Sequence, residues 1–371
     1  MVDRPSNYWI YRMSSNLTGL VTSVNSYLDN TKKPISGFLL MCNFNPFEII
    51  SKYENEINHE YKLKTLQRND SIYSFILKRH IKRIDSKREI EGKAIISRTE
   101  KKNIYLVITD DSLDFLYNAL KRFFEINYPR ISLVYFSSYN LKATLDELTR
   151  LTGGEIIADK TVAYTRERGK ISQVTYTSKS HIDVFSKAAE DDLWVDKIKF
   201  SLFEMNDERK LILNAFISRD GVFKCGNNFK TFYAIAIKNM ISLADGLFNL
   251  YINRSRIEKD KISCSKPLSI KFNYPVFETV ERNKNLIEAM EKMTYSSISV
   301  LHANPYLHIT LSDFLDGSSY DIQVLSEDKI TIIPQLKSTY SSLNRMIDTI
   351  FRRFGEGTVK NFEVELCNRE S

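Results

Sequence analysis

The stretch NIYLVITDDSLDFLYNALKRFFEINYPRISLVYFSSYNLKATLDELTRLTGGEIIA occupies residues 103–158 and decides the expected fold. It holds three short apolar runs, at 104–109, 131–136 and 155–158, separated by two amphipathic segments. Continuous apolar runs of this length are typical of strands buried on both faces of a parallel sheet. Pro129 and the pair Gly153-Gly154 end the intervening helical patterns. The stretch therefore predicts a parallel β-α-β-α-β unit with right-handed crossovers.

The remainder of the chain is organised around this unit. At 371 residues it exceeds the usual size of a single hydrophobic core, so two domains are expected. The expected parts are an N-terminal helical arm at 1–35, an α/β domain at 36–205 and an α+β domain at 206–371. The last part combines a long helix at about 228–252, a linker-like stretch at 253–266 and an antiparallel β-meander. The expected fold class is α/β, with this α+β domain at the C-terminal end.

The C-terminal domain has the clearest local patterns. Its meander strands are expected at 297–302, 306–312, 319–325 and 329–333. A helix is expected at 341–354, because Leu343, Ile347 and Phe354 belong to one apolar stripe, Ser341 is a suitable N-cap and Gly355 a suitable end.

Composition limits the cellular setting. The four cysteines lie far apart and form no CxxC pair, which fits reduced thiols and gives no zinc signature. The N-terminal residues include no apolar stretch of signal-peptide length. The most apolar long segment, 229–251, carries lysine and aspartate side chains that would be costly in a lipid bilayer. We expect a cytoplasmic protein without membrane contact.

Positive charge is concentrated in one segment. Of the net charge of +7, residues 78–102 supply +6, with ten basic and four acidic side chains. Such a segment suits binding to phosphates, since each neutralised phosphate releases condensed counterions. Tyr73, Phe75 and His80 are close enough in sequence to offer stacking faces. A solvated hairpin, or a contact for an acidic protein, is the alternative. The candidate nucleic-acid-binding residues are Lys78, Arg79, Lys82, Arg83, Lys87, Arg88, Lys93 and Arg98.

Common catalytic motifs are absent from the sequence. There is no GxxxxGK[ST] phosphate loop, no GxGxxG dinucleotide motif, no HExxH and no GxSxG. We therefore expect no cofactor, and the balance is against an enzyme.

Two acidic clusters are candidates for metal binding. Asp110 and Asp111 follow the strand expected at 104–109, and carboxylates at such a position can hold Mg²⁺. Adjacent residues of a strand point to opposite faces, so capping of the next helix, for which Asp111 or Ser112 is suitable, is the favoured role of Asp111.

The second acidic cluster consists of Glu190, Asp191, Asp192 and Asp196. An acid, one spacer and then lysine would indicate a restriction-type nuclease, but the residue two positions after Asp196 is Ile198. The weak metal candidates are therefore Asp110, Asp192 and Asp196.

A third cluster of polar side chains occupies residues 301–322. His302, His308 and Thr310 would share one face if a turn at Asn304-Pro305 pairs their strands. Two histidines can hydrolyse a phosphodiester by acid–base catalysis without a metal. The HxT at 308–310 resembles half of a two-histidine phosphoesterase site, and the sequence has no second HxT or HxS. A ligand-binding site or a hairpin with buried histidines is the alternative.

These patterns favour a non-catalytic, nucleic-acid-associated accessory or regulatory protein. Phosphates would bind the basic segment, and a partner protein would bind the C-terminal domain, where residues 262–371 carry 12 basic and 14 acidic side chains. The alternatives are a phosphodiesterase or nuclease, and an interaction subunit without nucleic-acid contact. Rich use of Lys, Ile and Asn is compatible with a prokaryotic or viral source. A role in prokaryotic antiviral defence is compatible with this profile, although no residue requires it.

Overall fold

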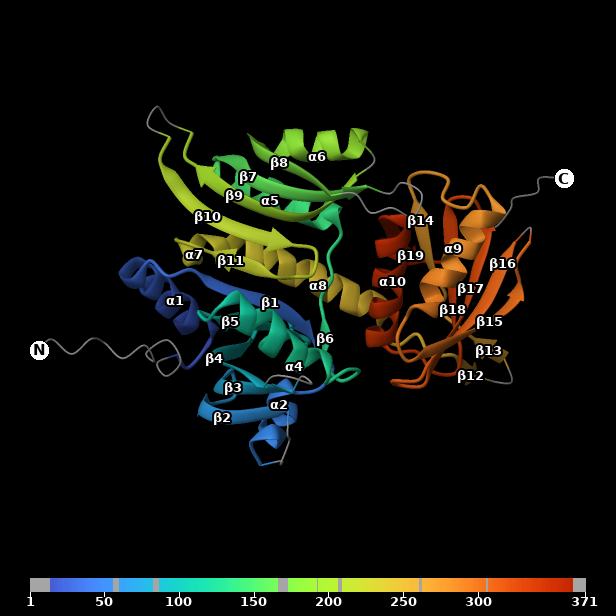
Figure 1. The fold of residues 1–371 in the computed structure, drawn as a ribbon, viewed down its shortest axis with the longest axis horizontal. Helices are drawn as coiled ribbons and strands as arrows, with labels where there is room; N and C mark the ends of the chain where they lie inside the picture. The colour runs from blue at the N-terminus through green and yellow to red at the C-terminus, as the bar shows by residue number, and fades with distance from the viewer. Residues whose placement is uncertain are drawn as a thin grey trace, which may run out of the picture. The chain divides into compact units, whose positions relative to one another are not determined.

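A computed structural model describes residues 14–55, 60–82, 87–165, 173–191, 193–205, 209–259, 262–304 and 306–362. Internal contacts divide the chain into two units, residues 1–246 and 247–371. Figure 1 labels most of the helices and strands of the two units.

One large antiparallel sheet is the framework of the first unit. In the described residues its order is β2-β3-β4-β5-β1-β11-β10-β9-β7-β8, and β6 also pairs with β1. The strands are β1 (Ile35–Met41), β2 (Tyr61–Arg68), β3 (Ile72–Lys82), β4 (Lys87–Arg98), β5 (Ile104–Thr109), β6 (Ser132–Leu133), β7 (Glu155–Thr165), β8 (Gln173–Ser180), β9 (Leu193–Phe203), β10 (Leu211–Ser218) and β11 (Phe223–Cys225).

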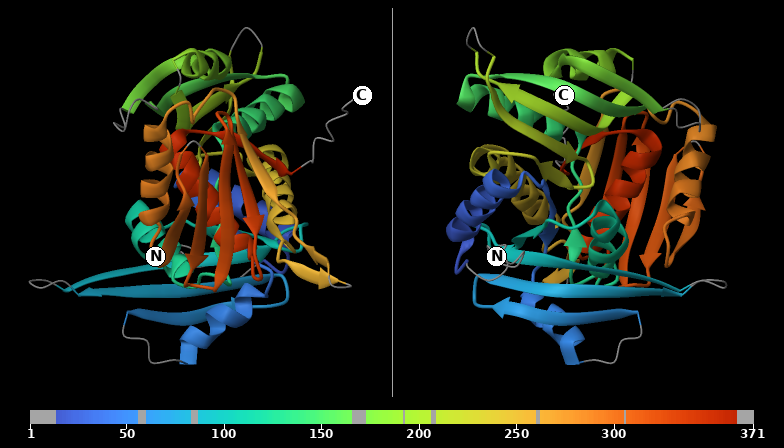
Figure 2. Two further views of the ribbon diagram at one scale, coloured as in Figure 1. Left: turned by 90° about the vertical axis from the view of Figure 1, so that its right-hand side faces the viewer. Right: turned by 60° about the vertical axis from the view of Figure 1, so that its left-hand side comes forward.

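Short helices accompany this sheet, and two of them pass through π-helical turns. The helical elements are α1 (Leu17–Thr31), α2 (Pro46–Asn55), α3 (Leu113–Phe115), η2 (Leu116–Lys121), α4 (Arg122–Glu125), α5 (Ser138–Thr152), α6 (His181–Glu190), α7 (Phe229–Phe232), η3 (Tyr233–Ile237) and α8 (Lys238–Tyr251), the last of which continues into the second unit. Figure 2 shows α2 beside β2 at one end of the sheet. Across the described residues, no helix combines the length and apolar character that a membrane crossing needs.

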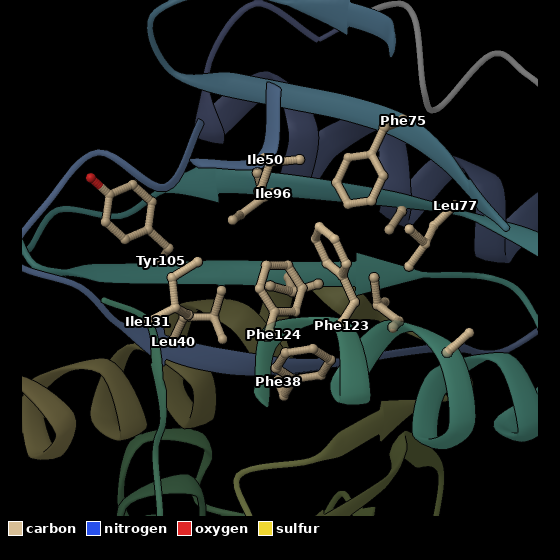
Figure 3. Close-up of a cluster of buried hydrophobic side chains, with 14 of the residues drawn as sticks. Phe38, Leu40, Ile50, Phe75, Leu77, Ile96, Tyr105, Phe123, Phe124 and Ile131 are labelled. Atoms are coloured by element: carbon tan, nitrogen blue, oxygen red, sulfur yellow. The ribbon is translucent and has the colours of Figure 1, made fainter. Parts of the chain in front are cut away.

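Aromatic side chains fill the core between β1–β5 and the helices that follow β5. Phe124 of α4 meets Phe38 of β1 edge to face, with ring centroids 5.7 Å apart, and Phe123 meets Tyr53 of α2 at 4.8 Å. In Figure 3 the two α4 rings lie between the strand side chains Phe38 and Phe75. Such edge-to-face pairs add to the free energy of burying large apolar rings. We call the side of β1–β5 that faces this core the covered side.

The expected parallel β-α-β-α-β unit is wrong. β5 pairs antiparallel with β1 and β4, the two-residue β6 pairs antiparallel with β1, and β7 pairs antiparallel with β8 and β9. The three expected strands therefore have no ladder with one another. All six residues of β5 are buried, so the strand is covered on both faces, as its apolar run indicates. That burial arises here within an antiparallel sheet, and an apolar run contains no information on strand direction.

The expected domain limit at 205/206 lies between β9 and β10, which are hydrogen-bonded neighbours in this sheet. Residues 209–246 belong to the first unit by their contacts.

The second unit is a smaller antiparallel sheet with two main helices. In the described residues its strand order is β15-β16-β17-β18-β14-β19, and β12 pairs with β13 separately. Its elements are β12 (Ile257–Lys259), β13 (Ile262–Cys264), β14 (Leu268–Phe272), α9 (Val280–Glu291), β15 (Ser296–His302), β16 (Leu307–Asp313), β17 (Ser318–Ser326), β18 (Lys329–Pro334), α10 (Tyr340–Phe354) and β19 (Gly357–Asn361). Burial alternates along β16 and β17, so one face of this sheet is covered and the other is open.

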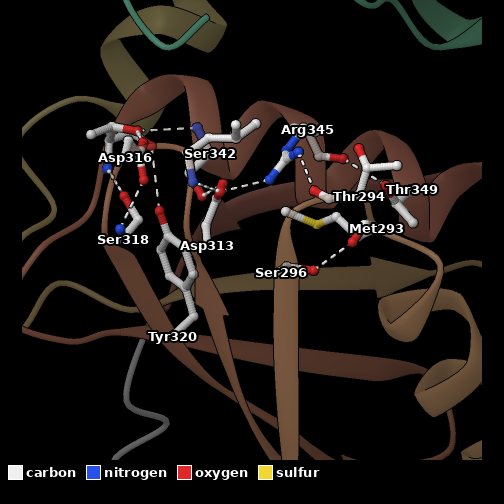
Figure 4. A network of polar contacts seen from close by, with 12 residues as sticks. Met293, Thr294, Ser296, Asp313, Asp316, Ser318, Tyr320, Ser342, Arg345 and Thr349 are labelled. Atoms are coloured by element: carbon white, nitrogen blue, oxygen red, sulfur yellow. Dashed lines mark hydrogen bonds and ion pairs between the residues drawn. The ribbon is translucent and has the colours of Figure 1, made fainter.

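A buried polar network joins the end of β16 to α10. Asp313 has no solvent exposure, and its Oδ1 lies 2.7 Å from Nη2 of Arg345. The Ser342 hydroxyl donates to Asp313 Oδ2 at 2.8 Å, and Arg345 Nη1 donates to the carbonyl of Thr294 at 2.7 Å. Figure 4 shows these contacts. The network satisfies a charge that would otherwise be costly to bury.

Thr339 caps α10, whereas the sequence pattern favoured Ser341. The Thr339 backbone is extended, and its hydroxyl accepts from the amide N–H of Ser342 at 3.1 Å. Ser341 is already inside the first turn and is fully buried.

Candidate nucleic-acid interface

The basic segment forms the β3–β4 hairpin, and strand alternation divides its side chains between the two sides of the sheet. Arg79, Arg88 and Arg98 are on the covered side, together with core residues such as Phe75 and Ile96. Lys78 and Lys93 are on the opposite side. Lys82 and Lys87 are register partners, and the structure describes their backbones but not their side chains. Arg83 lies outside the described residues.

The arginines on the covered side have partners within the fold. Nη2 of Arg79 lies 2.7 Å from Oε1 of Glu60, and its guanidinium lies over the Tyr61 ring. Nη2 of Arg88 lies 2.6 Å from Oδ2 of Asp114. The guanidinium of Arg98 lies 5.8 Å from the centroid of the Phe47 ring. These groups hold the hairpin to neighbouring elements through ion pairs and cation–π contacts.

The opposite side gathers lysines from three strands. Lys62 of β2 is the register partner of Lys78 of β3, and Lys64 of β2 and Lys93 of β4 both pair with Ile76. Lys62 and Lys64 are exposed, and Lys78 and Lys93 are partly exposed. Register partners have Cα atoms about 5 Å apart, and residues two apart along a strand are separated by about 7 Å. We call Lys62, Lys64, Lys78 and Lys93 the lysine face.

Two glutamates reduce the charge of the lysine face. Nζ of Lys78 lies 2.7 Å from Glu89 and 3.5 Å from Glu91, and Nδ1 of His80 lies 3.0 Å from Glu89. The hydrogen bond that Lys78 donates to Glu89 raises the pKa of Lys78, and the same contact lowers the pKa of Glu89. The strongest phosphate contacts are therefore expected from the two exposed lysines, Lys62 and Lys64.

The expected stacking residues do not form a platform for bases. Tyr73 and Phe75 are fully buried in the core on the covered side of the sheet, and His80 is engaged by Glu89. Bulky aromatic residues in an alternating strand face the core here, because their burial is more favourable than their exposure. For Tyr73 and Phe75 the expected stacking role is therefore wrong.

Sequence inspection missed Lys62 and Lys64. They precede the basic segment by more than a dozen residues, and only the β2–β3 pairing brings them beside it. The signal was present in the run Tyr61-Lys62-Leu63-Lys64, whose strict alternation places both lysines on one side of a strand.

Asp110 and Asp111 have structural partners in the first unit. Oδ2 of Asp110 accepts from the Tyr27 hydroxyl at 2.6 Å and lies 3.2 Å from Nζ of Lys33. Oδ2 of Asp111 accepts from the amide N–H of Lys93 at 2.6 Å, and burial raises the pKa of this carboxyl. Ser112 is the N-cap of α3, where the sequence favoured Asp111.

The described members of the second acidic cluster are paired with lysines. Glu190 and Asp191 both pair with Lys187, at 3.8 and 3.0 Å, and Asp196 lies 3.7 Å from Nζ of Lys197. Asp192 lies outside the described residues. Within the part of the chain that the structure describes, no group of three or more His, Cys, Asp or Glu side chains is arranged to hold a metal ion.

The structure brings the two candidate histidines together on the open face of the second sheet. His302 of β15 is the register partner of His308 of β16. Nε2 of His308 lies 3.8 Å from Oδ1 of Asp321, and the Thr310 hydroxyl donates to the same oxygen at 2.8 Å. A histidine pair beside a carboxylate can exchange protons with a bound substrate.

Comparison with known proteins adds no relative. The chain matches no protein-family model, and a search among curated proteins gives no match either.

Proposed function

We propose that this protein binds the phosphate backbone of nucleic acid through the lysine face, as an accessory protein without catalysis of its own. The observation that carries the proposal is the alignment of four lysines from β2, β3 and β4 on one side of the sheet. Their spacing along and across the strands lets several lysines contact one phosphate chain at once. Arg79, Arg88 and Arg98 of the same hairpin have partners inside the fold and are assigned to its stability.

The expected binding is electrostatic and independent of sequence. Each lysine that neutralises a phosphate releases counterions, so affinity falls steeply as the salt concentration rises. Lys78 contributes least, because Glu89 and Glu91 already compensate its charge. Affinity in the range of non-specific binding, with Kd of roughly 10⁻⁴ to 10⁻⁶ M at physiological salt, fits so small a patch.

The second unit is the proposed contact for a protein partner. Among the described residues, β15 is the first strand in its sheet order and pairs with β16 alone, so it is an edge strand there. Val300 and Leu301 of this strand are exposed by 46% and 60%. An edge strand with exposed apolar side chains offers backbone hydrogen bonds and apolar area to another protein.

The His302–His308 pairing favours a second candidate function, metal-independent hydrolysis of a phosphodiester. The pair lies on an open sheet face beside Asp321, where one imidazole could accept a proton and the other donate one. Cleavage of RNA or DNA in the presence of EDTA that disappears in His302→Ala and His308→Ala would select this candidate over the accessory role.

The accessory proposal is tested by a variant in which all four lysines of the lysine face are replaced by alanine. Binding to labelled single- and double-stranded DNA and RNA would be measured by fluorescence anisotropy at low salt. We expect affinity to fall at least tenfold, because several lysine–phosphate interactions are removed together.

A matched control removes the same charge elsewhere. Lys32, Lys179, Lys210 and Lys230 are exposed lysines of the first unit outside the lysine face. Their replacement by alanine should change affinity less than about threefold, because general attraction between separated charges is screened by salt. Equal reductions of affinity in the two variants would mean that net charge alone drives binding, and the proposed interface would be wrong.

A further inference from the structure

The sheet of the first unit has a cleft of about 450 Å³ that is separate from the lysine face. Its floor is formed by β1, β9, β10 and β11, and Leu113 and Tyr117 of α3 and η2 form part of its wall. Ser36 of the floor and the core residue Phe38 are two positions apart on β1, so their side chains lie on the same side of the sheet. The cleft and the lysine face therefore lie on opposite sides of the sheet and on different strands. Its volume is in the range of small-molecule sites.

Two aromatic rings give the cleft an apolar interior. Phe216 of β10 and Tyr117 of η2 are partly buried, and both pack against the main core cluster of the unit. Burial and the nearby carboxylates of Asp220 and Asp196 raise the pKa of the Tyr117 hydroxyl, which therefore stays neutral. Rings anchored in this way are rigid surfaces for a flat ligand.

Two lysines flank Phe216 in register. Lys199 of β9 is its partner on one side, and Lys224 of β11 is its partner on the other. Adjacent strands are about 4.8 Å apart, so the two lysine backbones are about 10 Å apart with the phenyl ring between them. Both side chains line the cleft. Two flexible ammonium groups at this separation can converge on a single anionic group above the ring.

The carboxylates around the cleft have their own partners. Asp220 lies 2.6 Å from Nζ of the buried Lys121, and Asp196 lies 3.7 Å from Lys197. Asp159 accepts from the Ser201 hydroxyl at 3.0 Å. Within the residues that the structure describes, neither Lys199 nor Lys224 is in an ion pair with any carboxylate. Lys160, the register partner of Lys199 on β7, adds a third cation to the same row.

We propose that this cleft binds a nucleoside monophosphate, with the base against Tyr117 and Phe216 and the phosphate between Lys199 and Lys224. A nucleoside monophosphate combines an aromatic base with an anionic phosphate a few ångströms away. The base would stack on the two aromatic rings, and the phosphate would bind the two ammonium groups. The proposal does not rest on the lysine face, since none of the four lysines of that face lines the cleft.

The experiment is isothermal titration calorimetry with AMP, GMP, CMP and UMP, and with adenosine, inorganic phosphate and decanoate as partial probes. At least one monophosphate should bind with Kd below about 1 mM, and more tightly than either the nucleoside or the phosphate alone. Lys199→Ala combined with Lys224→Ala should weaken that binding at least tenfold, while Lys210→Ala, an exposed lysine before β10, should leave it unchanged. Phe216→Leu keeps an apolar side chain at the core and should reduce the difference between bases.

Three results would overturn the proposal: no monophosphate binds, the double lysine variant binds as well as the wild type, or decanoate binds and the nucleotides do not. Circular dichroism spectra and melting curves would show that each variant is folded. The variant lacking the lysine face should bind the monophosphate normally, so failure here and failure of the nucleic-acid proposal are distinguishable.

Discussion

The Asp313 network of the second unit and the lysine face of the first unit use charge in opposite ways. Asp313 has no exposure, and Arg345 and Ser342 contact its carboxylate directly. Lys62 and Lys64 are exposed. Removing a partner from a buried pair leaves a charge uncompensated, whereas removing a solvated lysine leaves nothing unsatisfied. Burial therefore separates charges that stabilise the fold from charges that are available to a ligand.

The largest expected effect is from Asp313→Asn. The substitution keeps the shape of the side chain and leaves the Arg345 guanidinium without its carboxylate, so the free energy of unfolding should fall by about 3 kcal/mol. Urea unfolding followed by far-ultraviolet circular dichroism measures it. Asp328→Asn is the matched control, because this residue is 41% exposed and lies 4.0 Å from Lys271. An equal effect in the two variants would show that the network has no special role.

A smaller loss of stability is expected when Asp220, a partly buried and paired carboxylate of the first unit, is replaced. Burial acts to raise the pKa of this carboxyl, but the ammonium groups of Lys121 and Lys197 and the Ser218 hydroxyl outweigh it and hold the pKa below its usual value. A carboxyl with a lowered pKa in the folded state contributes stability above its unfolded pKa, near 3.9, and loses it as the pH falls through the folded value.

Asp220→Asn should therefore cost about 2 kcal/mol at neutral pH, and the difference from wild type should shrink as the pH falls below about 4. Tryptophan fluorescence during urea unfolding follows this unit, because Trp194 belongs to β9 of its sheet. A difference that stays constant from pH 7 to about pH 3 would contradict the assigned role of the Lys121–Asp220 pair.

Local patterns in the sequence were sufficient to predict many of the strands and the last helix of the second unit. Strands expected at 297–302, 306–312, 319–325 and 329–333 are found as β15–β18 within about one residue at most ends. Turn residues such as Asp316-Gly317 and a strict period of two specify a hairpin from neighbouring residues alone. The apolar stripe of α10 is likewise a local pattern.

The first unit could not be predicted in the same way. β1 pairs with β5, β6 and β11, and its register partners are up to 190 residues away in the sequence. No local pattern encodes such partners. The candidate site shows the same limit. Lys78 and Lys93 were visible as charge in the basic segment, but their position beside Lys62 and Lys64 depends on the β2–β3 pairing. Long-range pairing thus decided both the architecture and the proposed interface.

The smallest expected effect on stability belongs to the lysine face itself. Replacing all four lysines by alanine should change the free energy of unfolding by less than about 0.5 kcal/mol per site, as is usual for exposed side chains. The same variant should show the largest reduction in nucleic-acid binding. This contrast between stability and binding distinguishes a ligand-binding surface from a structural one.

The most direct test is the slope of log affinity against log salt concentration for double-stranded DNA, compared between two variants of the same part of the sheet. For the variant without the lysine face, the slope should become shallower by about 3 units, close to 0.9 for each phosphate that is no longer neutralised. For Arg79→Ala combined with Arg88→Ala, which removes cations already paired with Glu60 and Asp114, the slope should change by less than about 0.5. An unchanged slope in the lysine variant, or an equal change in the arginine variant, would contradict the assignment of phosphate binding to the lysine face.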